Sequence, residues 1–204
     1  IILTGRHLGT RTLISYRTPD DRVVPTEALA AESLQKMDGR KAIPMIGKPV
    51  EIGAKVEDFE LPTDDGDVFR LSGHAGKPVV LFFYPKDDTT GCTAEAKDFT
   101  RLAGDFRSAG IAVLGISPDS IKKHQKFKIK HALDVKLAAD EDHAVAERFG
   151  VWVEKSMYGR KYMGIERSTF LIDGRGRLAQ AWRKVSVPGH ADAVLDAARA
   201  LQIK

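Results

Sequence analysis

A seven-residue apolar run at residues 78–84 constrains the fold of this chain more than any other feature. It reads Pro-Val-Val-Leu-Phe-Phe-Tyr and contains no charged residue. Successive side chains of a strand point to opposite faces, so an unbroken apolar run of this length is typical of a strand buried on both sides. A second such run covers residues 111–116, and segments with helical spacing follow both runs. The sequence therefore predicts parallel strands covered by helices on both faces.

The remaining segments predict the order of the elements. Further strands are expected at 68–71, 136–139, 168–172 and 178–182, and helices at 92–108, 120–133, 144–149 and 191–201. The turn Asp173-Gly174-Arg175-Gly176 lies between the last two strands and is typical of a β-hairpin. Strand–helix–strand crossovers followed by a hairpin predict an α/β protein with a thioredoxin-like fold, in which helices flank a central mixed sheet.

The first fifty residues differ in character from the rest. Residues 1–19 carry three arginines and no acid, which faintly resembles an organelle transit peptide, although the favoured interpretation is an extension or arm without a catalytic role. A short helix is expected at 26–37, followed by a linker that contains Pro44, Gly47 and Pro49. We therefore expect an N-terminal extension at 1–49, partly helical or flexible, and one folded domain at 50–204.

Charge and composition argue against several classes of protein. The first fifty residues hold a net charge of +3 and the remainder only +1, whereas a nucleic-acid binder usually presents a clustered basic face. The lysines within 122–130 form the single basic cluster, which suits a solvated helix face or a partner-docking surface. No apolar run approaches the ~20 residues of a membrane-spanning helix. We expect no nucleic-acid partner, no membrane and a cytoplasmic location.

Cys92 is the single cysteine of the sequence. It follows the apolar run at 78–84 and a polar loop, and it opens a predicted helix. The N-terminus of a helix presents unpaired N–H groups and the positive end of the helix dipole, and both stabilise a thiolate. A lone cysteine is often only a small buried apolar side chain, but this position also suits a nucleophile.

The residues around Cys92 resemble the peroxiredoxin signature. Pro85, Thr89 and Cys92 match its Pro-x-x-x-Thr-x-x-Cys spacing. The sequence of residues 84–93 is similar to that of the bacterioferritin-comigratory (PrxQ-type) branch. Residues 53–61 resemble the opening segment of that family, with Glu57 in place of the usual proline, and residues 167–173 resemble the strand that carries its active-site arginine. The resemblance covers residues 50–204 and implies a thioredoxin-like fold.

The resemblance also implies a reaction and four site residues. Cys92 would attack the O–O bond of hydrogen peroxide or an organic hydroperoxide and become a sulfenic acid. Thr89 would hold the peroxide, Arg167 would stabilise the thiolate and the developing charge, and Pro85 would shape the loop and shield the sulfur. Taken singly, Thr89 could be a plain helix cap, Arg167 a surface ion pair with Glu166 or another acid, and Pro85 a strand stop.

The sequence departs from this branch at Lys97, where many members carry a resolving cysteine. By elimination the cycle should be 1-Cys, with glutathione, glutaredoxin or thioredoxin as an external reductant. No cofactor and no metal are expected, because the acidic residues and histidine at 140–143 are adjacent and suit a turn better than a cation site. A monomer or weak homodimer is expected. The alternative function is a thioredoxin-fold redox sensor or holdase module without efficient turnover.

Overall fold

The computed structural model describes residues 3–8, 11–17, 23–25, 49–157 and 159–202. The chain divides into two compact units, residues 1–45 and 46–204. In the first unit β1 (Leu3–Leu8), β2 (Arg11–Arg17) and β3 (Val23–Pro25) form an antiparallel sheet in that order, which the sequence did not predict. The helix expected at 26–37 and the linker positions 44 and 47 lie outside the described residues.

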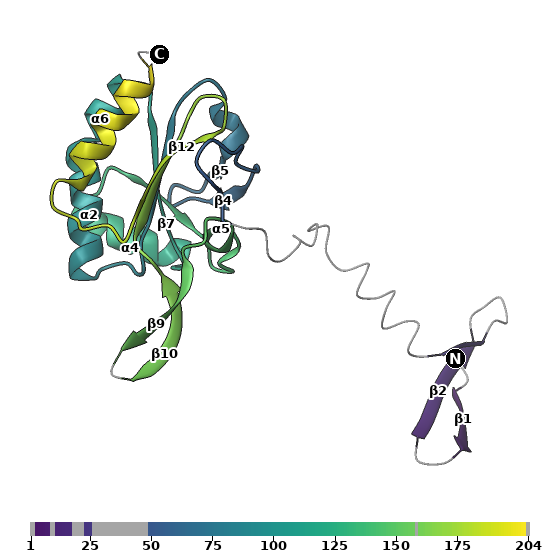
Figure 1. Ribbon diagram of the computed structural model, residues 1–204. Coiled ribbons are helices and arrows are strands. Elements are labelled where there is room, and N and C mark those ends of the chain that lie inside the picture. Colours follow the sequence, from purple (N-terminus) through teal and green to yellow (C-terminus); the bar gives the residue numbers. More distant parts are fainter. Residues whose placement is uncertain (1–2, 9–10, 18–22, 26–48, 158, 203–204) are drawn as a thin grey trace. The chain divides into compact units, whose positions relative to one another are not determined.

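A five-stranded mixed sheet forms the centre of the second unit (Figure 1). Its order is β12-β11-β6-β7-β8, and β6 runs parallel to β7 and β7 to β8, whereas β11 pairs antiparallel with both β6 and β12. The strands are β6 (Val79–Phe83), β7 (Ala112–Ser117), β8 (Lys136–Ala139), β11 (Ser168–Ile172) and β12 (Leu178–Arg183). The α/β thioredoxin-like fold predicted from the sequence is confirmed.

Alternate side chains of β6 enter two separate hydrophobic clusters. Val80 and Phe82, with Tyr84 directly after the strand, pack with one layer, and Val79, Leu81 and Phe83 pack with the other. The first layer contains α2 (Thr90–Arg101), α3 (Ala103–Ser108), α4 (Ile121–His131) and α6 (His190–Gln202). The second contains β4 (Glu60–Pro62), β5 (Val68–Arg70), the 3₁₀ helix η1 (Leu71–His74) and α5 (Ala144–Arg148), on the opposite side of the sheet in Figure 1.

In the second unit β4 and η1 were not predicted from the sequence, and the structure also differs from the prediction at one helix and one hairpin. The helix expected at 92–108 is broken at Leu102, where ψ is 2°, so α2 and α3 are separate helices. A hairpin of β9 (Trp152–Met157) and β10 (Arg160–Ile165) was not predicted, and it projects from the sheet in Figure 1. Residues 160–163 are all exposed, so the alternation of buried and exposed side chains that marks a strand is missing there.

Candidate active site

Cys92 lies where the sheet, a loop and a helix meet. It is the third residue of α2, which follows the carboxyl end of β6 after residues 84–89, and it is 2% exposed. The N–H groups of Gly91 and Cys92 belong to the first turn of α2, whose N–H groups have no partner within the helix. The cysteine therefore combines a buried thiol with free backbone donors.

Arg167 reaches the thiol from a different part of the fold. It lies in the connection between β10 and β11, and its Nη2 donates to Cys92 Sγ over 3.3 Å, while Nη1 donates to Glu95 Oε2. Although burial disfavours its charge, Glu95 and Cys92 raise the pKa of Arg167 above its ordinary value. One partly buried cation thus bridges the sulfur and a carboxyl, and the surface pair with Glu166 considered from sequence is replaced by a pair with Glu95.

Glu95 belongs to this site, although sequence reasoning gave it no role. It lies one turn after Cys92 on α2 and is buried. Burial raises the pKa of Glu95 to about 7, against the opposing effect of Arg167, and its second oxygen, Oε1, has no hydrogen-bond partner among the described residues. The i,i+3 spacing from Cys92 was the available signal, because it places both side chains on one helix face.

The other two predicted residues, Thr89 and Pro85, shape the loop. Thr89 occupies the N-cap position of α2, and its hydroxyl donates to the Lys86 carbonyl over 3.2 Å instead of capping the helix. Pro85 is half-buried and directly follows Tyr84 at the end of β6. Within the described residues neither side chain makes a hydrogen bond to Cys92. The structure thus brings Cys92 and Arg167 into contact and places Thr89 and Pro85 on the segment that leads to them.

Gly91 leaves room for the arginine beside the thiol. A Cβ atom at this position would lie 3.2 Å from Arg167 Nη2, which is closer than most Cβ contacts in proteins. A larger residue at 91 would therefore displace the guanidinium that contacts Cys92.

Comparisons with known proteins give a family match and similar proteins of known name. Residues 52–181 match the model of the AhpC/TSA family. Peroxiredoxin Bcp of Bacillus subtilis is 52% identical over 69% of this chain and 90% of its own length, and a putative peroxiredoxin bcp of Coxiella burnetii is 49% identical over 72% and 97%. Peroxiredoxin Q of Xanthomonas campestris superposes with a TM-score of 0.69 at 47% identity, over 74% of this chain and 96% of that one.

The chain is a Bcp/PrxQ-type peroxiredoxin of the AhpC/TSA family. It is a thiol peroxidase, with a peroxide as substrate and a thiol-based reductant, and these assignments match the main function predicted from the sequence. The sensor or holdase alternative finds no support in these relatives.

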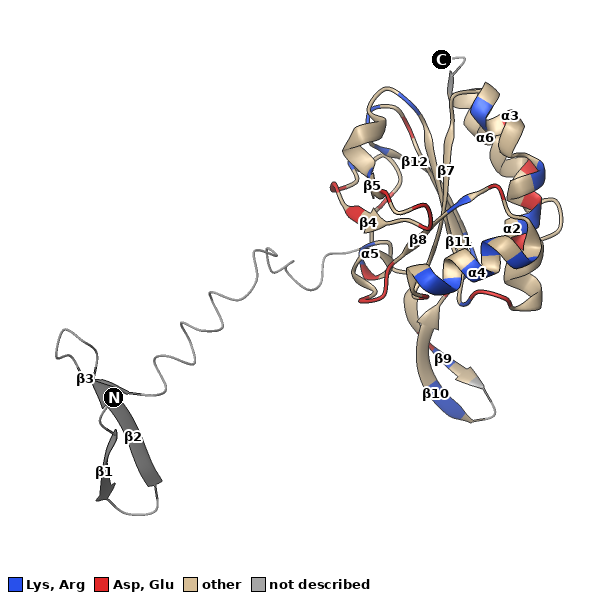
Figure 2. Ribbon diagram, turned by 180° about the vertical axis from the view of Figure 1, so that it is seen from behind, with Lys and Arg blue, Asp and Glu red and all other residues tan. Residues whose placement is uncertain are grey.

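The basic cluster of this peroxiredoxin is largely neutralised by its neighbours. Figure 2 shows lysines along α4, and three of the five lysines within 122–130 form ion pairs with carboxylates. The pairs are Lys123 with Asp119, Lys128 with Asp64 and Lys130 with Asp88. The cluster therefore has the character of a solvated helix face more than that of a phosphate-binding surface.

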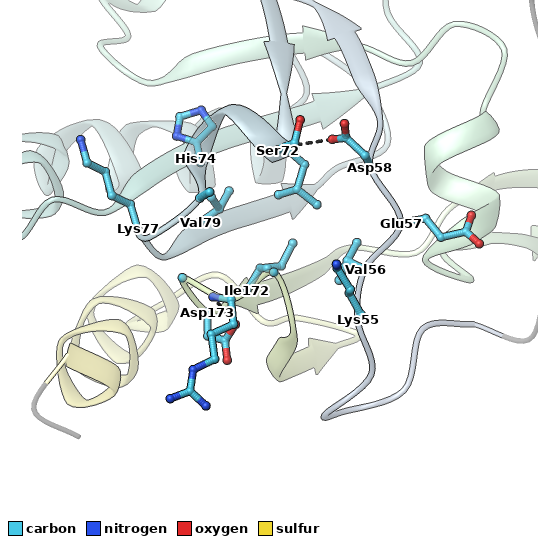
Figure 3. A pocket seen from close by; sticks show the side chains of 15 residues that line it. Lys55, Val56, Glu57, Asp58, Ser72, His74, Lys77, Val79, Ile172 and Asp173 are labelled. Atoms are coloured by element: carbon cyan, nitrogen blue, oxygen red, sulfur yellow. Dashed lines mark hydrogen bonds between the residues drawn. The ribbon is translucent and has the colours of Figure 1, made fainter.

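A pocket of about 550 Å³ lies far from Cys92 along β6, at the start of that strand and the end of β11 (Figure 3). Its floor is apolar, and its rim carries three cations and three carboxylates, so its charge selects no ion of either sign. The charged residues are Lys55, Lys77, Arg175, Glu57, Asp58 and Asp173. Asp58 is also engaged by the backbone N–H of Ser72, at 2.8 Å.

The acidic segment at 140–143 serves the backbone of α5. Asp140 accepts the N–H groups of Val145 and Ala146, at 3.2 and 2.8 Å. Among the described residues, no three His, Cys, Asp or Glu side chains are arranged to hold a metal ion. No helix in the described part of the chain combines the length and the apolar character that crossing a membrane requires.

Proposed function

We propose that this peroxiredoxin reduces hydrogen peroxide and organic hydroperoxides with Cys92 as the peroxidatic nucleophile. The observation that carries the proposal is the contact of Arg167 Nη2 with Cys92 Sγ at the N-terminus of α2. A guanidinium and a helix N-terminus both favour the thiolate, which is the reactive form of cysteine.

The first half-reaction is an attack by the Cys92 thiolate on one oxygen of the peroxide. A new S–O bond forms, the O–O bond breaks, and the departing oxygen leaves as water or an alcohol after taking a proton from solvent. Cysteine is oxidised to the sulfenic acid and the peroxide is reduced by two electrons. Arg167 and the N–H groups of the first turn of α2 are donors for the negative charge that develops on the departing oxygen.

Thr89 and Pro85 complete the proposed catalytic set. The Thr89 hydroxyl would exchange the Lys86 carbonyl for a peroxide oxygen and hold the peroxide in line with the sulfur. Pro85 would keep the loop shaped around the thiol and limit access of water. Their place on the loop between β6 and α2 supports these roles.

The second half-reaction needs an external thiol, because this sequence contains one cysteine and carries Lys97 where many relatives have a second. A thiol attacks the Cys92 sulfenic acid, releasing water and leaving a mixed disulfide, and a second thiol restores the Cys92 thiol. Glutathione, glutaredoxin and thioredoxin are all suitable. The Bcp of Xanthomonas campestris has been studied for alkyl peroxide reduction, which supports organic hydroperoxides as substrates here.

We further propose that residues 50–204 form the catalytic domain and that residues 1–49 are an extension without a catalytic role. The family match begins at residue 52 and the second compact unit at residue 46, which supports this division. We propose a cytoplasmic monomer or weak homodimer that binds neither nucleic acid nor membrane, in keeping with the small net charge of residues 51–204.

Replacement of Cys92 by serine tests the function directly. Cys92→Ser should abolish peroxide consumption with glutathione or thioredoxin as donor, because the sole thiol is lost. Intact mass after one equivalent of peroxide should rise by about 16 Da in the wild type, and excess peroxide should add a further ~16 Da. The variant should show neither change and an unaltered circular dichroism spectrum. Turnover near the wild-type rate in Cys92→Ser would overturn the assignment.

A further inference from the structure

The loop that leads into the reactive helix is tied at Asp87 to a buried histidine of α4. Asp87 Oδ2 lies 2.8 Å from His124 Nδ1, and Oδ1 accepts the Tyr84 hydroxyl at 2.7 Å. The backbone N–H of Asp87 donates to Asp119 Oδ2, also over 2.7 Å. Asp87 is 7% exposed and His124 is fully buried, so water does not compete for these hydrogen bonds.

The orientation of His124 follows from its second nitrogen. Nε2 lies 3.1 Å from the Ala138 carbonyl at the edge of the sheet, and a carbonyl oxygen only accepts, so Nε2 carries a hydrogen. The ring is thereby fixed with Nδ1 toward Asp87, and one proton between Nδ1 and Oδ2 makes that bond. His124 thus links β8, through Ala138, to the loop before Cys92.

A second tie joins the same loop to α4. Asp88 has φ of 61°, a left-handed conformation that residues other than glycine seldom adopt. Its side chain accepts His131 Nε2 at 2.7 Å and Lys130 Nζ at 2.5 Å. Two successive aspartates therefore hold the five-residue loop, residues 85–89, against one helix.

The course of this loop decides where Cys92 lies relative to Arg167. The loop joins β6 to α2 and so sets the position of the first turn of α2, whereas Arg167 enters from the connection between β10 and β11. The two partners in the 3.3 Å contact thus arrive on independent segments. A small displacement of the loop would misalign the sulfur without moving the guanidinium, and misplacement of reacting groups by about 1 Å can reduce rates ~100-fold.

We propose that His124, acting through Asp87, is a positioning residue for the peroxide reaction of Cys92. The proposal rests on the function proposed for Cys92, and His124 itself touches neither the thiol nor the peroxide. Its effect is confined to the oxidation step, which needs the packed and aligned sulfur. Reduction of the sulfenic acid needs the sulfur to become accessible to another thiol, so a loosened loop does not slow it.

Two substitutions at His124 separate positioning from general stability. His124→Asn keeps an amide donor near the place of Nδ1 and preserves the bond to Asp87, whereas His124→Gln keeps a donor near Nε2 and preserves the bond to Ala138. Two rate constants are measured in the full chain, that of Cys92 oxidation by hydrogen peroxide and that of sulfenic acid reduction by dithiothreitol. Samples are taken by rapid quench, the sulfenic acid is labelled with dimedone, and intact mass then gives the fraction of each form and hence both rate constants.

We expect His124→Gln to lower the oxidation rate constant about tenfold or more, and His124→Asn to stay within about threefold of wild type. Both should leave the reduction rate constant unchanged or raise it. Tyr84→Phe removes the hydroxyl that donates to Asp87 and keeps the aromatic ring of residue 84. It should lower only the oxidation rate constant, by about two- to fivefold. Lys126→Gln on the exposed face of α4 is the control and should change neither constant.

The proposal is overturned if Asn and Gln lower the oxidation rate constant equally, or if both rate constants fall together with the melting temperature. It is also overturned if no variant changes the oxidation rate constant. If the His124 variants do not fold, Tyr84→Phe decides the question. The proposal then requires that its oxidation rate constant falls and its reduction rate constant does not. A failure of the proposed function looks different, because wild type would then form no dimedone adduct at Cys92.

Discussion

At Arg167 one guanidinium serves two acceptors, the Cys92 sulfur and the Glu95 carboxyl. Its charge is shared between a group that reacts and a group that does not. Because Glu95 is buried and the Arg167 side chain is only 17% exposed, water screens these interactions little, and the electrostatic environment of the thiol depends strongly on Arg167 together with the N-terminus of α2.

Arg167→Met should therefore slow the oxidation of Cys92 by hydrogen peroxide more than about tenfold, because a charge-assisted donor to the sulfur and the departing oxygen is lost. Stopped-flow measurement of the second-order rate constant tests this. Arg175→Met, in an exposed turn without an ion pair among the described residues, is the matched control. Equal rate constants for wild type and Arg167→Met would contradict the role given to Arg167.

Glu95 should make the stability of the protein depend on pH. Its pKa is raised by burial from 4.5 to about 7, so between these values the folded protein holds a proton that the unfolded chain has lost. Stability should fall as pH rises from about 4.5 to about 7, by roughly 3 kcal/mol at most, and then level off.

Glu95→Gln should remove most of that slope, because glutamine does not titrate. Urea unfolding at pH 5, 6, 7 and 8 gives the comparison, with Glu57→Gln on the surface as the control. If wild type and Glu95→Gln showed the same dependence on pH, the carboxyl would not be the titrating group.

At the scale of elements, α2 holds both the nucleophile and the position of the missing second cysteine. Residues 92 and 97 are five apart on an intact helix, which places their sulfurs too far apart to bond. A disulfide between these positions requires the start of α2 to unwind.

Lys97→Cys reports on that unwinding. We expect a partial yield of intramolecular disulfide after peroxide and partial turnover with thioredoxin, because Thr90 and Gly91 lie in the first turn of α2 and helix ends open more readily than helix interiors. Non-reducing peptide mapping measures the yield, and Cys92→Ser/Lys97→Cys is the control. No disulfide at all would mean that the packing of α2 prevents local opening, and that the 1-Cys cycle has a structural cause beyond the absent thiol.

The central elements could be predicted because their sequences carry strong local patterns. β6 and β7 are buried apolar runs, and the turn at 173–176 brings β11 and β12 together as a hairpin. The β9–β10 hairpin could not be predicted, since residues 160–163 are all exposed and lack the alternation of buried and exposed side chains that marks a strand.

For the candidate site too, some residues could be predicted from local sequence, whereas their contacts could not. Cys92 and Arg167 were identified by resemblance to family motifs, and their contact depends on segments 75 residues apart meeting in space. The i,i+3 spacing places Glu95 on the helix face of Cys92, but its burial and its pairing with Arg167 are tertiary features that the spacing does not reveal. The link from Asp87 to His124 is likewise a tertiary contact across 37 residues.

At the scale of the whole molecule, the two compact units suggest an independent catalytic domain. Removal of residues 1–45 should leave both rate constants within about twofold of the full chain, because the core and the site residues lie in the second unit. Thermal unfolding and the peroxide reaction of the two forms are compared at equal concentration. A large loss of rate or stability would assign the N-terminal residues a part in the peroxidase.

The alternation of side chains along β6 separates two hydrophobic clusters on opposite faces of the sheet, and this separation matters for protein engineering. The layer of β4, β5 and α5 has no buried apolar side chain in common with the cluster around the thiol, and the ion pair of Lys128 with Asp64 is a polar link between the β4–β5 turn and α4. The face that carries the pocket in Figure 3 is thus the place to attach a fluorophore or an immobilisation tag. A sensor built there would keep its reactive sulfur in native surroundings.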